Sequence, residues 1–89
     1  MSKYDSLDNI EEDDAHIYVE DNGENENHVY IESPVIRTYG KRIRDIVLGE
    51  LNNNNIKGVN VYVYDNNALE CTIKCRLRDE LVNQGYIFG

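Results

Sequence analysis

The sequence predicts a small α+β domain of order ββαββα, in which helices pack on one face of an antiparallel sheet. Three observations support this fold class. Apolar and polar residues alternate at 16–20, 28–32 and 59–64, as they do in half-buried strands. Apolar residues between 36 and 51 recur at three- and four-residue spacing, as they do in an amphipathic helix. The length of 89 residues suits one small domain.

Two strands are predicted before the first helix, at residues 16–20 and 28–32, joined by a turn that contains Asn22-Gly23. Each of these strands begins with a histidine, His16 or His28. Two histidines beside carboxylates on a polar edge are usually surface residues, so we expect no metal site here.

The first helix is predicted to begin with Ser33 as its N-cap and Pro34 at its first helical position. It should run for about 17 residues and end at the asparagines 52–55, which tolerate left-handed backbone angles. The basic residues on its outer face fit a solvated helix surface better than a docking surface for an anion. The apolar stripe that should cover the sheet comprises Ile36, Tyr39, Ile43, Ile46, Val47 and Leu51.

Residues 58–81 are predicted to form the centre of the fold. A strand at 59–64 and a second strand at 69–75 should form a hairpin around a turn at 65–68, followed by a short helix at 76–83. A single helix over 67–83 is the alternative, because leucine and isoleucine also recur there at four-residue spacing. The β-branched and cysteine residues at alternate positions favour the strand.

The two cysteines, Cys71 and Cys75, are predicted to be small buried thiols in a reducing compartment. On a strand, residues four apart lie about 13 Å from each other, which is too far for a disulfide. On a helix they would approach, but no histidine or carboxylate cluster accompanies them to complete a metal site.

The net charge of −8 is concentrated in the first third of the chain. Residues 1–33 carry eleven acids and one base, whereas residues 34–89 carry six acids and eight bases. Residues 1–14 are predicted to be an acidic mobile tail ahead of a single domain at 15–89, because they show no apolar periodicity.

The same composition excludes two classes of partner. Nucleic-acid binding is not expected, since phosphate contacts need clustered Lys and Arg. No apolar run approaches the roughly 18 residues of a membrane span, and the acidic start of the chain is unlike a signal peptide. We therefore expect a cytoplasmic protein without a membrane partner.

From Ile31 onward the sequence resembles the acyl carrier subunit, or gamma chain, of citrate lyase. The most specific block is GVxxxVxDxxALxCxIxxRL at residues 58–77, and the likeness extends without a gap back to Ile10. The other shared residues are Ile31, Gly40, Ile43, Arg44, Ile46 and Leu51.

The resemblance implies a non-catalytic carrier. In that family a serine near the N-terminus is esterified to a phosphoribosyl-dephospho-coenzyme A arm. The arm holds acyl thioesters while the alpha chain transfers the acyl group and the beta chain cleaves it. The implied partners are therefore the citrate lyase alpha and beta chains. Nothing in the residue spacing anchors a catalytic set of this chain's own.

The resemblance also shows a departure at the attachment residue. The ungapped alignment puts Glu12 in the place of the family's serine and Asp14 in the place of a following acid. A carboxylate cannot form the serine phosphodiester. The chain's serines are Ser2, Ser6 and Ser33, of which Ser33 is predicted to be used as a helix cap. Ser6, six residues before the family position, is the predicted attachment residue, because a disordered tail tolerates such a shift.

Three functions remain open. The first is an acyl carrier subunit of a citrate-lyase-type complex, modified at Ser6. The second is a relative without the arm that serves as a non-enzymatic interaction or regulatory subunit. The third is an acidic inhibitor or nucleic-acid mimic that uses the N-terminal charge, and the resemblance makes it the least favoured.

Overall fold

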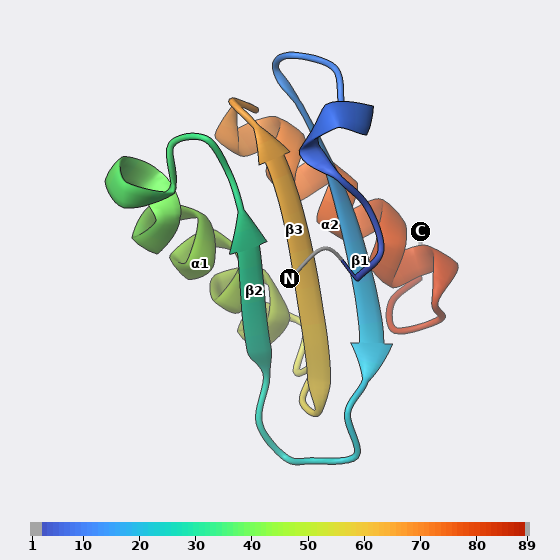
Figure 1. Cartoon of the computed structure of the whole chain (residues 1–89). Helices are drawn as coiled ribbons and strands as arrows, with labels where there is room; N and C mark the ends of the chain where they lie inside the picture. Colours follow the sequence, from blue (N-terminus) through green and yellow to red (C-terminus); the bar gives the residue numbers. More distant parts are fainter. Residues whose placement is uncertain (1–2, 89) are drawn as a thin grey trace.

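The computed structural model describes residues 3–88 and confirms an α+β fold, with two helices on one face of a three-stranded sheet (Figure 1). The elements in chain order are η1 (Leu7–Asn9, a short 3-10 helix), β1 (Asp14–Asp21), β2 (His28–Glu32), α1 (Ile36–Asn53), β3 (Val59–Asn66) and α2 (Glu70–Asn83). Neither α1 nor α2 has both the length and the apolar sequence that crossing a bilayer requires.

The sheet is mixed, so the prediction of an antiparallel sheet is wrong. Its strand order is β1-β3-β2. β3 pairs antiparallel with β1, where Ile17 lies opposite Val63, and parallel with β2, where Val29 lies opposite Val61. β1 and β2 therefore do not pair with each other, although the Asn-Gly turn signal between them is typical of hairpins. β3 is buried on both faces, and the centre of the sheet is where such a strand is most stable.

The loop between β1 and β2 crosses the start of β3. The N–H of Asn22 donates to the carbonyl of Gly58 at 2.9 Å, and the N–H of Val59 donates to Oδ1 of Asn27 at 3.1 Å. Gly58 has a φ of +81°, and a Cβ there would lie 2.4 Å from the carbonyl oxygen of Glu24. Glycine is therefore required at the point where the loop passes this strand.

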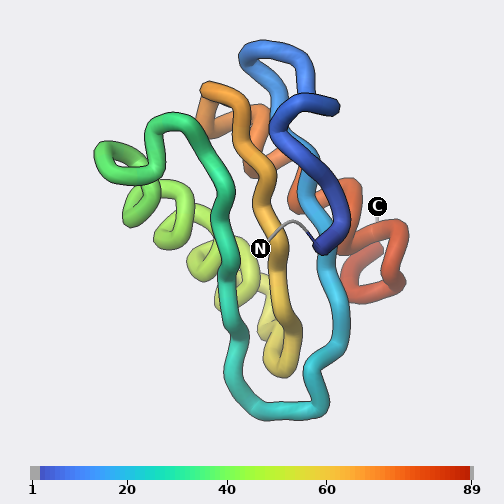
Figure 2. Tube along the Cα trace, in the orientation of Figure 1, coloured from blue at the N-terminus to red at the C-terminus, as the bar shows by residue number. Residues whose placement is uncertain are grey.

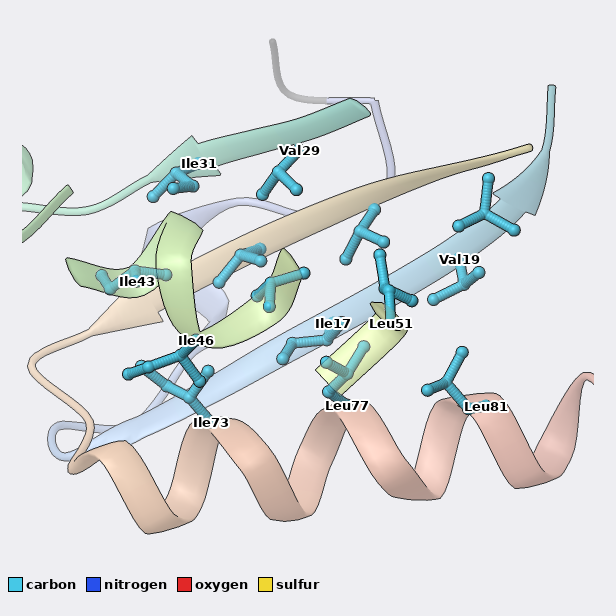
Figure 3. Packing of buried hydrophobic residues seen from close by; sticks show 14 of the residues in the cluster. Ile17, Val19, Val29, Ile31, Ile43, Ile46, Leu51, Ile73, Leu77 and Leu81 are labelled. Atoms are coloured by element: carbon cyan, nitrogen blue, oxygen red, sulfur yellow. The ribbon is translucent and has the colours of Figure 1, made fainter. Parts of the chain in front are cut away.

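The main core lies between the sheet and the two helices (Figure 3). Val59, Val61 and Val63 of β3 are fully buried, as their alternation predicted. Each fully buried aliphatic side chain of this kind stabilises a fold by roughly 1.5–3 kcal/mol. The helix residues in this core are Ile43, Ile46, Val47 and Leu51 of α1 and Ile73, Leu77 and Leu81 of α2.

The predicted strand at 69–75 is wrong, because residues from Glu70 onward form α2. The alternative of a single helix ending at Asn83 is correct, although this helix begins three residues later than the alternative placed it. Ile73, Leu77 and Leu81 are its buried residues, and their spacing of four puts them on one side of a helix.

The Asp/Asn cluster at 65–68 connects a strand to a helix and does not close a hairpin. Oδ1 of Asp65 accepts a hydrogen bond from the N–H of Ala68 at 2.9 Å. Asn67 adopts a φ of 61°, a left-handed conformation that asparagine tolerates better than most residues. Asp65 and Asn67 have side chains that favour turns, as the sequence indicated. A turn built from such residues can lead into either a strand or a helix.

Both cysteines are exposed, so the prediction of buried thiols is also wrong. Cys71 lies two residues before the buried Ile73, and Cys75 lies two residues before the buried Leu77. Two residues correspond to about 200° of rotation around a helix, which turns both thiols away from the core. Both are free cysteines.

α1 begins later than predicted. Its N-cap is Val35, which makes no side-chain capping hydrogen bond, and its first helical residue is Ile36. Ser33 lies in the preceding turn, where its Oγ accepts a hydrogen bond from the N–H of Val35 at 3.1 Å. The predicted apolar stripe is correct from Ile43 onward, whereas Ile36 and Tyr39 are 45% and 56% exposed.

Candidate functional site

The face of the sheet opposite the helices is built from tyrosines. Tyr62 and Tyr64 of β3 alternate with the core valines Val61 and Val63 in sequence and are buried on this second face. Tyr18 of β1 packs against them, and Tyr30 of β2 stacks on Tyr62 with ring centroids 5.0 Å apart. Buried aromatic rings on this face need a cover, and the N-terminal residues provide it.

Residues 3–9, which we call the strap, lie across the tyrosine face (Figure 2). The hydroxyl oxygen of Tyr64 accepts hydrogen bonds from the N–H of Lys3 at 3.1 Å and from the N–H of Tyr4 at 3.0 Å. The Tyr4 ring stacks on Tyr18 with centroids 5.1 Å apart. The acidic tail thus has a defined path over the sheet from residue 3 onward. Its mobility stays a prediction.

Asp5 fixes the middle of the strap to β1. Its Oδ2 lies 2.6 Å from Nδ1 of His16 and accepts a hydrogen bond from the Tyr18 hydroxyl at 2.8 Å. The Asp5 side chain is only 9% exposed. The hydrogen bond with His16 is the main cause that holds the pKa of Asp5 well below its usual range. Burial, followed by the hydrogen bond to Asp5, raises the pKa of Tyr18 to about 12.

Glu20 of β1 fixes the start of the strap. Its carboxylate accepts hydrogen bonds from Nζ of Lys3 at 2.8 Å and from the Tyr4 hydroxyl. The bond from Lys3 is the largest cause that lowers the pKa of Glu20 to about 2. The Lys3 ammonium also lies 5.2 Å from the centroid of the Tyr62 ring, within the range of a cation–π contact.

Ser6, the predicted attachment residue, is the half-buried N-cap of η1. Its Oγ accepts a hydrogen bond from the N–H of Asp8 at 3.4 Å, and its hydroxyl proton is donated to none of the described residues. It opens onto a shallow groove whose other lining residues are Leu7, Ile31, Glu32, Ser33 and Ile36. Ser6 therefore lines an open groove, and none of the described residues accepts its hydroxyl proton.

Ser33 offers no comparable hydroxyl. It is buried, and its Oγ donates to Oδ2 of Asp65 at 2.8 Å while accepting from the N–H of Val35. Ser2 lies outside the described residues. Of the two serines that the structure describes, Ser6 alone presents a hydroxyl that an incoming group can reach.

Glu12, which we expect to stand in the place of the family's serine, lies exposed on the turn between η1 and β1. Asp13, which follows it, has a φ of 67°. Asp14 begins β1 and forms a two-pronged ion pair with Arg76 of α2, at 3.1 and 3.3 Å. The N–H of Ala15 and then Arg76 lower the pKa of Asp14. Glu12 thus lies on a surface turn that precedes a strand start held against α2.

The two histidines belong to different clusters. His16 lies beside Asp5, whereas His28 lies on the loop side of β2 beside Glu24, at 3.4 Å. Glu24, Glu26 and His28 offer ligand atoms within 4.8 Å of one another, but exposed groups of this kind are common without an ion.

The strap contacts were not found from the sequence, because Asp5 and Lys3 were interpreted only as parts of a charged tail. One signal pointed to them. Tyr62 and Tyr64 occupy alternate positions of a strand whose other face already carries the core valines. A strand apolar on both faces needs covering on both, and the residues before β1 are near enough to provide the second cover.

Comparison with known proteins identifies the family. The model of the malonate decarboxylase delta subunit (MdcD) family matches residues 9–82. The chain belongs to this family. It is also 37% identical over 54 residues to the citrate lyase acyl carrier protein of Lactiplantibacillus plantarum, strain WCFS1. The predicted resemblance is confirmed. No solved structure matches the chain.

The extent of these matches bears on the attachment residue. The alignment to the citrate lyase acyl carrier protein covers 61% of this chain and 56% of that protein, so the chain spans little more than half of this relative. The family match begins at residue 9, so it includes Glu12 and leaves Ser6 outside.

Proposed function

We propose that this protein is the acyl carrier subunit of a lyase or decarboxylase complex of the citrate lyase and malonate decarboxylase type. The family match over residues 9–82 carries the proposal. The small, fully packed core holds no enclosed catalytic set among the described residues, and the accessible hydroxyl lies on a separate segment. A carrier needs this division between a stable body and a reactive group on its periphery.

Ser6 is the residue that would bear the phosphoribosyl-dephospho-coenzyme A arm. Its oxygen would become the ester oxygen, which its geometry permits because its proton is bonded to no described residue. When bound, the arm supplies the thiol that carries the acyl group as a thioester. Tethering through a chain segment raises the effective concentration of that thioester at a partner's active site. The partners under this proposal are the citrate lyase alpha and beta chains.

A second candidate function is a relative of that carrier without the arm, acting as an interaction or regulatory subunit. Glu12 favours it, because a carboxylate stands where the family's attachment serine aligns and lies exposed on its turn. The carboxylate of Asp8, close to Ser6 in the chain, also repels a phosphodiester at that serine. The fold and the partner-binding surfaces would be the same in both cases.

Intact-mass measurement of the protein purified from its own host separates the two. The carrier predicts an added mass equal to the nucleotide arm, present in the wild type and absent from Ser6→Ala. Glu12→Ser restores the family residue and serves as the second variant. An unmodified wild type that co-purifies with the lyase subunits, and gains the mass only as Glu12→Ser, supports the subunit without an arm. An unmodified protein that binds neither lyase chain contradicts both.

A further inference from the structure

The strap is held by polar contacts and by the packing of Tyr4 and Leu7 on the tyrosine face, and none of its residues enters the main core. No residue of η1 is buried, and the first buried residue after it is Ile10. The strap's anchors are side chains of β1 and β3, chiefly the carboxylate–imidazole contact of Asp5 and the hydroxyl of Tyr64. Segments with few buried apolar contacts open locally at a lower free-energy cost than the core, while the rest of the fold stays intact.

Asp5 is the central anchor. Its carboxylate makes the contacts with His16 and Tyr18, and its other oxygen accepts the N–H of Ser6 at 2.8 Å. Loss of this one side chain removes the attachment of the strap's middle to β1. The contacts of Lys3 and Tyr4 would then hold only the start of the strap.

We propose that the strap exchanges between a docked and a released state, with Asp5 as the anchor that sets the balance. In the docked state Ser6 lies on the body of the domain beside α1 and β2. In the released state residues 3–9 extend from Ile10 and carry Ser6 away from the tyrosine face. The role of Ser6 as the carrier serine rests on the proposed function, whereas the exchange itself rests only on the contacts of the strap.

Backbone ¹⁵N relaxation of the full chain tests the exchange. Asp5→Asn should lower the order parameters of residues 4–8 below about 0.6, while those of β3 stay near about 0.85. Asp8→Asn is the matched control: it removes the same charge from the same segment, and the exposed Asp8 side chain makes no hydrogen bond or ion pair with the described residues. Wild-type order parameters in Asp5→Asn, or an equal loss in Asp8→Asn, would overturn the proposal.

A second pair of variants tests the anchor on β3. Tyr64→Phe removes the hydroxyl that accepts the N–H groups of Lys3 and Tyr4, and it should loosen residues 3 and 4 most. Tyr30→Phe removes a hydroxyl from the same face without touching the strap. If both variants leave the strap equally ordered, the Tyr64 hydroxyl is not an anchor and the proposed docked state is wrong.

The solvent accessibility of residue 6 can be measured on protein that carries no prosthetic arm. In a Cys71→Ser, Cys75→Ser background, Ser6→Cys should react with a maleimide at least threefold faster when Asp5→Asn is added, and at an unchanged rate when Asp8→Asn is added. Equal rates in all three overturn the proposal that release exposes this position. Because the readout does not use the host's modification, it stays valid if native Ser6 proves unmodified, and the mass experiment stays valid if the strap proves rigid.

Discussion

Asp65 shows how one residue joins two turns of this fold. It is 1% exposed, and its two carboxylate oxygens accept hydrogen bonds from the Ser33 hydroxyl at 2.8 Å and from the N–H of Ala68 at 2.9 Å. The first partner belongs to the turn before α1 and the second to the turn before α2. The carboxylate therefore fixes the starts of both helices against the end of β3.

Asp65→Ala should lower the free energy of unfolding by about 2–4 kcal/mol, because it leaves the buried Ser33 hydroxyl and the half-buried Ala68 N–H without an acceptor. Urea denaturation followed by circular dichroism measures the loss. Asp79→Ala, on the exposed side of α2, is the control and should change stability by less than about 0.5 kcal/mol. Equal stabilities of the two variants would mean that the Asp65 hydrogen bonds are replaced by water.

At the scale of single elements, the outer side of α2 is exposed, and this predicts that its two thiols are reactive in the folded protein. Cys71 and Cys75 should both be alkylated by iodoacetamide in the native protein, at rates within about threefold of those in urea, because no packing shields them. Mass spectrometry after timed quenching gives the rates. Protection of both thiols until the protein unfolds would restore the strand, with its buried cysteines, that the sequence favoured.

The contacts of the strap should weaken in acid before the core unfolds. Asp5 and Glu20 both have a pKa lowered in the folded state, so their stabilising contacts are complete above the usual carboxyl pKa of about 4 and are lost as the pH falls toward about 2. Between about pH 6 and about pH 2.5, amide shifts of residues 3–6 should therefore change before those of Val61. The groups that face the two carboxylates are the Ser6 N–H and the side chains of Asn9, His16, Tyr18, Lys3, Tyr4, Asn60 and Tyr62.

An Asp5→Asn, Glu20→Gln double variant provides the comparison, since neither amide titrates in this range. Its strap should show no transition of its own in acid. A strap transition of unchanged midpoint in that variant would assign the acid sensitivity to other groups.

The elements differ in how far their sequences specified them. β1, β2, β3 and the main part of α1 follow from local periodicity, because each places a regularly spaced row of apolar side chains in the main core. The first half of α2 does not, since Leu69, Cys71, Ile73 and Cys75 satisfy a two-residue alternation as well as Ile73, Leu77 and Leu81 satisfy a four-residue one. Burial against β1 and α1 selects the helix, and that contact lies outside any local window.

The strap lay beyond local patterns for a related reason. Its anchors join Lys3 and Tyr4 to Tyr64, about sixty residues further along the chain. Local charge density correctly describes residues 1–14 as acidic, but it carries no information on which tyrosine hydroxyl or histidine these residues meet. The proposed attachment at Ser6 has the same difficulty, because the family match begins only at residue 9, where the strap ends.

For the molecule as a whole, stability depends on one thin apolar layer. A domain of about 90 residues buries a modest share of its surface, so a single large cavity consumes much of its stability. Leu77 is fully buried at the centre of α2. Leu77→Ala should cost about 2–5 kcal/mol and lower the melting temperature by about 10 °C or more.

Calorimetry measures that shift, and Val82→Ala, at a half-buried position of the same helix, is the control. The variant at 82 should lose less than half as much. Similar losses at both positions would indicate that α2 contacts the sheet through a different side.

The central position of β3 in the sheet has a consequence for folding while the chain is being synthesised on the ribosome. The two outer strands are made first and can bond only to the middle one, which is translated after them and after α1. For that interval the nascent chain exposes two unpaired β-strands, a form that invites association with neighbouring chains. The dense negative charge of the first 33 residues repels neighbouring chains of the same kind. The acidity of this region therefore protects the nascent polypeptide against association until β3 has been synthesised.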